Sequence, residues 1–176
     1  MTTKQYLKEF EDFLTQQEYE NNNSLTSDYE TEQREWLAKI DEFYNLIQEF
    51  IGDYLEQGKI TQEWKNIQLQ EDHFGEYEVQ QLMLKIGKKR LIFKPIGRFL
   101  IGFNRGRIDL SSDVGTVRFV LLPEDLESPQ ITDFNHSFNP SNAKWCWKIA
   151  TSPPKVSYLE LTEQSFFEAL MEVVNA

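Results

Sequence analysis

The short string NRGRIDL contains the side chains best suited to chemistry in this sequence. Arg105 and Arg107 could grip a phosphate or carboxylate, and Asp109 could act as a base or bind a metal ion. The same string has a structural interpretation, because its Asn and Gly suit a tight turn and an arginine could pair with Asp109 across it. We favour the structural pair, and we keep an enzyme centred on Arg105, Arg107 and Asp109 as the third functional hypothesis.

The string ends a strongly basic segment. Residues 85–107 hold eight of the eighteen Lys and Arg residues and no acid, in a chain whose net charge is −11. Three interpretations stand: an ordinary solvated sheet face, a dock for an acidic protein, and a groove for nucleic acid. The candidate binding residues of this region are Lys88, Lys89, Arg90, Lys94, Arg98, Arg105, Arg107 and Asp109. Trp64 is a further candidate, because it has no clear periodic partner and an exposed Trp is a good anchor for a partner, although core burial is favoured.

Metal and cofactor chemistry finds little support. The two histidines, His73 and His136, are far apart in the sequence, and Cys146 is the single cysteine. Between two tryptophans, Cys146 has the pattern of a small buried side chain. There is no glycine-rich phosphate loop and no nucleophile elbow. We therefore expect no metal, no cofactor and no catalytic residue.

The distribution of charge and hydropathy disfavours some classes of partner. Residues 1–78 carry 19 acids against 6 bases, which disfavours generic attraction to nucleic acid or anionic membranes. This acidity could be a surface that binds a basic partner, although a solvated helix face is the simpler interpretation. The apolar runs are too short to span a membrane, and the N-terminus has acids where a signal peptide would be apolar. The expectation is a cytoplasmic protein without a membrane partner.

The helices are predicted by apolar spacing. Lys4–Tyr19 and Tyr29–Gln57 each place apolar residues three and four positions apart, and the Asn-rich string ENNNSLTSDYE between them predicts a loop. Gly58 is placed to end the second helix in a left-handed cap. A last helix is expected over Glu163–Val174, with Thr162 as its N-cap.

In the middle of the chain, apolar and polar residues alternate with a period of two, in runs that are divided by short turn sequences. This pattern predicts an antiparallel meander, because the gaps are too short for crossover helices. The predicted inward residues are Leu82, Leu84, Ile86, Leu91, Phe93, Val117, Phe119 and Leu121, with Lys85, Lys94 and Arg118 on the opposite face.

The sequence thus predicts a single α+β domain, 1–176, in which the meander packs against N-terminal helices and a C-terminal helix. Its expected parts are a mainly helical region (1–58), the β-meander (76–122), a long loop (123–143), two strands (144–161) and a helix (162–175). The function we predict is a non-enzymatic protein-binding module, such as an immunity protein, an antitoxin or an accessory protein of a bacterial system. The alternative is a nucleic-acid-associated protein that uses the basic segment.

Overall fold

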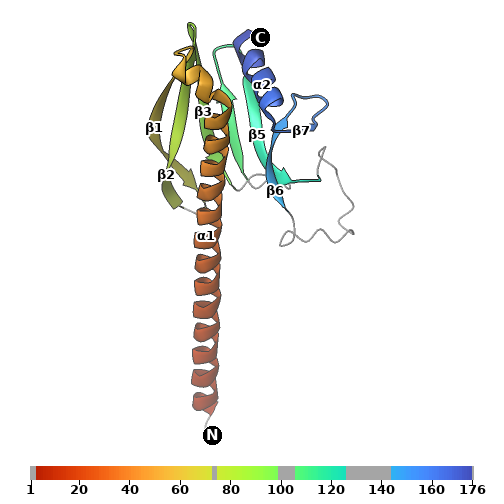
Figure 1. Ribbon diagram of the computed structural model, residues 1–176. Helices are drawn as coiled ribbons and strands as arrows, with labels where there is room; N and C mark the ends of the chain where they lie inside the picture. The colour runs from red at the N-terminus through yellow and green to blue at the C-terminus, as the bar shows by residue number, and fades with distance from the viewer. Residues whose placement is uncertain (1–2, 73–74, 99–105, 126–143, 176) are drawn as a thin grey trace.

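The computed structural model describes residues 3–72, 75–98, 106–125 and 144–175, with side chains described for all of these except residues 3–6 and 19–28. One seven-stranded sheet carries both helices on the same side, and the longer helix extends well beyond the sheet (Figure 1). The predicted α+β class, a β-meander with N-terminal and C-terminal helical layers, is confirmed.

The first 56 residues form one helix rather than two. Helix α1 runs from Thr3–Glu56 through the segment that we expected to be a loop. Asn, Ser and Thr each disfavour a helix by only about 0.7 kcal/mol or less, whereas the strong helix breakers Gly and Pro are absent before Gly52. The predicted end is confirmed: Gly58 has φ +69°, and the amide of Lys59 donates to the carbonyl of Tyr54 at 2.9 Å.

The sheet is a strict meander in which each strand pairs antiparallel with the next one along the chain. The strands are β1 Ile60–Glu71, β2 Gly75–Ile86, β3 Lys89–Gly97, β4 Arg107–Ser111, β5 Thr116–Pro123, β6 Trp145–Ala150 and β7 Tyr158–Glu160. Helix α2, Glu163–Asn175, follows, and the predicted cap is present because the amide of Ser165 donates to Thr162 Oγ1 at 3.1 Å. Strand β1 was not predicted, so the sheet begins before the expected meander.

The core lies between the helices and one face of the sheet. Seven of the eight residues predicted to point inward are buried, the eighth, Ile86, is half-buried against the core, and the cations predicted on the other face are exposed. Phe43 of α1 is central, with ring centroids 5.1 Å from those of both Phe119 and Trp147. Phe166 of α2 closes the cluster at 6.2 Å from Phe93. The two helices and the sheet therefore share one aromatic core.

The β1–β2 hairpin is strongly twisted toward its turn, where β1 ends at Glu71 and β2 begins at Gly75. At this far end, the face that packs on α1 is the one that points away from the core in the rest of the sheet. Leu82 and Leu84 are buried on β2, but beyond them the buried residues are Tyr77 and Val79, which have the opposite parity. This end of the hairpin is a two-stranded ribbon, because β3 pairs with β2 only from Leu82 onward, and two-stranded ribbons twist more than wide sheets. The twist carries Tyr77 to α1.

Candidate functional site

Arg107 and Asp109 form the pair that the sequence suggested. Arg107 Nε lies 2.9 Å from Asp109 Oδ1, and its Nη2 donates to Oδ2 at 3.1 Å. The two residues are neighbours on one face of β4 rather than partners across a turn. Arg105 lies outside the described residues. Because the carboxylate is held by the guanidinium, the pair has the geometry of a structural ion pair.

A basic surface covers the sheet face opposite the helices. Lys85 of β2 faces Arg90 of β3, and Lys94 of β3 faces Asp109, which in turn faces Arg118 of β5. An apolar cross-strand pair, Met83 and Ile92, lies between these two rows. We call this surface the basic sheet face; it consists of Met83, Lys85, Arg90, Ile92, Lys94 and Arg118. Asp109 lies within it, paired with Arg107, and exposed Glu63 of β1 borders it opposite Met83.

The four cations of the basic sheet face are exposed, and none lies within 4.0 Å of a carboxylate of the described residues. Met83 and Ile92 are half-buried and do not belong to the core cluster. The predicted solvated sheet face is thus correct in position. Its charges, however, are not neutralised by acids of the packed helices, which lie on the other side of the sheet.

The other candidates of the basic segment lie elsewhere. Lys88 is exposed in the β2–β3 turn, and Lys89 pairs with Asp113 at 3.1 Å. Arg98 is buried, with Nη1 3.5 Å from Glu32 Oε2 on α1 and its backbone amide donating to Glu71 Oε1 at 2.7 Å. Arg98 therefore ties the end of β3 to α1 and β1, and it does not belong to the exposed surface.

Trp64 packs against the core rather than projecting from it. Its ring meets Tyr44 edge to face, with centroids 4.9 Å apart, and the residue is half-buried. The favoured interpretation of Trp64 as a core residue fits this geometry, and its use as an anchor stays a prediction.

A second surface lies on the part of α1 that projects beyond the sheet (Figure 1). Leu7, Phe10, Phe13 and Leu14 are between 45 % and 60 % exposed, and the rings of Phe10 and Phe13 stack with centroids 6.4 Å apart. We call residues 7–18 the tail and these four residues the tail stripe. The sequence pattern indicated this helix and its apolar face, but not that the fold would leave the face uncovered.

The tail is acidic as well as apolar. It contains Glu9, Glu11, Asp12 and Glu18 but only one base, Lys8. At 100° per residue, Glu9 borders the tail stripe on one side and Glu11 and Glu18 border it on the other. The tail therefore presents an apolar ridge between acidic margins.

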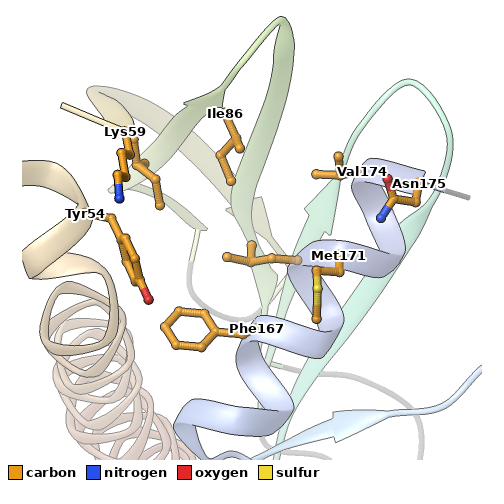
Figure 2. Close-up of a pocket in the computed structure, with 9 residues that line it drawn as sticks. Tyr54, Lys59, Ile86, Phe167, Met171, Val174 and Asn175 are labelled. Atoms are coloured by element: carbon orange, nitrogen blue, oxygen red, sulfur yellow. The ribbon is translucent and has the colours of Figure 1, made fainter. Parts of the chain in front are cut away.

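An apolar pocket of about 340 Å³ lies where α1 ends against α2 and the β1–β2 strands (Figure 2). Figure 2 shows Phe167 and Met171 of α2 on one side and Tyr54 and Lys59 on the other. No carboxylate or imidazole lines it, and the titratable side chains in its lining are Tyr54 and Lys59.

Reactive groups are few among the described residues. They contain no cluster of three or more potential metal ligands, and none of their helices has an apolar run that could cross a bilayer. His73 and His136 lie outside the described residues. Burial raises the pKa of the Cys146 thiol above its ordinary value, which keeps it protonated and weakly nucleophilic.

Comparison with family models, curated proteins and solved structures returned no match. The two surfaces, the basic sheet face and the tail stripe, are therefore the features from which a function can be argued.

Proposed function

We propose that this chain is a non-enzymatic protein-binding module and that the tail stripe is a contact surface for its partner. One observation carries the proposal: four large apolar side chains lie half-exposed on adjacent turns of a helix, outside the core of the fold. Single exposed apolar residues are common, but a contiguous apolar patch with a polar margin is typical of an interaction site.

The size of the tail stripe indicates how it binds. Removing the exposed part of each of its four side chains from water would contribute on the order of 1 kcal/mol, or about 4 kcal/mol together. The loss of translational and rotational freedom on association costs about 4–15 kcal/mol. The tail stripe therefore needs further contacts, and the acids along its margins favour a partner with cations beside an apolar strip.

The alternatives have less support. A surface that binds single-stranded nucleic acid needs aromatic rings for stacking, and the basic sheet face contains none. An enzyme centred on Arg107 and Asp109 would need a concave site at these residues, whereas neither of them lines the apolar pocket between α1 and α2. Within the protein-binding class, an immunity protein, an antitoxin or an accessory protein of a bacterial system stays a prediction from composition, as does a cytoplasmic location.

A photo-crosslinking experiment in cells of the native host tests this proposal. A benzoylphenylalanine at position 10 samples the tail stripe, and the same group at position 12, about 160° further round the helix, samples the opposite side. We expect a discrete protein adduct from position 10 and none from position 12. Equal labelling from both positions, or no adduct from position 10, would contradict a contact role for the tail stripe.

A further inference from the structure

The basic sheet face has the complementary pattern to the tail. Its apolar pair, Met83 and Ile92, lies between the cationic pair Lys85 and Arg90 on one side and Lys94 on the other, and its one acidic neighbour along the row is Glu63 of β1, opposite Met83. The tail has an apolar ridge with acids on both margins. When an apolar strip meets an apolar ridge, the flanking cations and acids come together and fix the orientation of the contact.

The tail cannot reach the basic sheet face of its own chain. Leu14 precedes Trp36, the first described residue of α1 that is buried, by 22 residues, which places it about 33 Å further along the helix. The same continuous helix packs on the opposite side of the sheet (Figure 1). A tail that occupies this face must therefore come from another molecule.

We propose that the basic sheet face of one copy binds the tail of a second copy. This inference rests on the proposed protein-binding function and names the partner as the chain itself. Two copies that exchange tails form two identical contacts, which is the reciprocal arrangement that closes a two-fold dimer.

Two other occupants fit less well. Pairing of two tails along their stripes brings the acidic margins containing Glu11 and Glu18 near one another, which is repulsive. Nucleic acid would match the charge of Lys85, Arg90, Lys94 and Arg118, but not the apolar centre of the face.

Sedimentation velocity of the full chain provides the first measurement. We expect reversible self-association that weakens at least tenfold when the salt concentration rises from about 0.1 M to about 1 M, because the Debye length falls from about 10 Å to about 3 Å. A chain that stays monomeric up to the highest concentration measured overturns the inference. In that case the crosslinking experiment still decides the proposed function, because its adduct would contain a different protein.

A reciprocal charge swap identifies the surfaces. One variant carries Arg90→Glu and Lys94→Glu, so the positive charge of its sheet face is cancelled while its tail stays acidic; the other carries Glu9→Lys and Glu11→Lys, so both of its surfaces are basic. We expect each variant alone to be monomeric and their equimolar mixture to associate. A control with Lys59→Glu and Lys155→Glu has the same charge change at exposed positions outside both surfaces, and it should associate like the original chain.

The remaining outcomes also decide the question. Self-association that persists in the Arg90→Glu, Lys94→Glu variant overturns the inference and favours tail–tail pairing. A mixture that stays monomeric also overturns it. If a fluorescent oligonucleotide binds the original chain but not this variant, and no self-association occurs, the basic sheet face is a nucleic-acid surface instead.

Discussion

Trp36 donates its indole N–H to the hydroxyl of Tyr77 at 2.9 Å, and this bond joins α1 to the far end of β2. The Tyr77 hydroxyl in turn donates to the Glu71 carboxylate, which also accepts the backbone amide of Arg98. Arg98 pairs with Glu32 of α1. This closed series of contacts lies where the helix leaves the sheet, so it fixes the direction in which the tail projects.

Replacing Tyr77 with Phe removes the centre of this series. The buried indole N–H of Trp36 loses an acceptor and Glu71 loses a donor, so we expect the free energy of unfolding to fall by about 1–3 kcal/mol. Urea denaturation measures this change. Tyr54→Phe is the matched control, because Tyr54 is 39 % exposed and should lose little. Equal stability of both variants would contradict a role for the Tyr77 hydroxyl.

The two glycines Gly106 and Gly52 should respond in opposite directions to alanine. A Cβ at Gly106 would overlap the ring of Trp36, whereas a Cβ at Gly52 meets no atom within 4 Å. We expect Gly106→Ala to destabilise the fold by about 1–3 kcal/mol through overpacking. Gly52→Ala, inside α1, should stabilise it by up to about 1 kcal/mol. Thermal unfolding of the pair tests both signs, and a stable Gly106→Ala variant would show that Trp36 does not pack there.

Alkaline pH should unfold the protein through Tyr44 and Tyr77. Burial raises the pKa of both phenols above the ordinary value of about 10. Their contribution to stability is complete below pH 10 and is lost as the pH rises toward the raised values, because the unfolded chain releases these protons first. With both groups, the free energy of unfolding should fall by at most about 2.7 kcal/mol per pH unit above about 10.

Phenolate absorbance during a pH titration measures this effect. Two of the seven tyrosines should ionise only together with the loss of near-ultraviolet circular dichroism. Ionisation of all seven while the near-ultraviolet signal persists would disprove it. In a Tyr77→Phe variant, one tyrosine fewer should ionise with unfolding.

Alanine substitutions at Phe43 and Phe10 should have different effects: the first should lower stability, and the second should weaken binding. Phe43 is fully buried among aromatic rings, whereas Phe10 is 59 % exposed. We expect Phe43→Ala to cost about 3–5 kcal/mol of stability, and Phe10→Ala to leave the urea midpoint nearly unchanged while weakening partner binding. A large loss of stability in Phe10→Ala would mean that the tail stripe is part of the fold.

Alternation predicted most of the sheet because one of its faces is buried. Leu82, Leu84 and Phe93 point inward where the period of two places them. Strand β1 was missed because it lies at the edge of the sheet and its buried residues do not alternate: Ile60 and Leu69 are buried, but the residues between them are at most half-buried. An edge strand pairs on one side only, so its sequence is less constrained.

The candidate surfaces were predicted only in part. Alternation placed Lys85, Lys94 and Arg118 on the outer face, but it could not show that Arg98 is buried beside Glu32, since that contact joins residues far apart in the sequence. Likewise, the spacing of Phe10 and Phe13 predicts an apolar helix face without indicating whether the fold covers it. Both facts depend on tertiary packing, which local periodicity does not contain.

The strict neighbour order of the seven strands also bears on how quickly the chain reaches its native state. Within β1–β5 each connection is at most nine residues long, so little loop entropy is lost before those contacts form, whereas 21 residues separate β5 from β6. The slower event should be the capture of Trp147 by α1, whose indole N–H donates to the carbonyl of Lys39 across 108 residues. Refolding kinetics should therefore show the meander forming before β6 docks on the long helix.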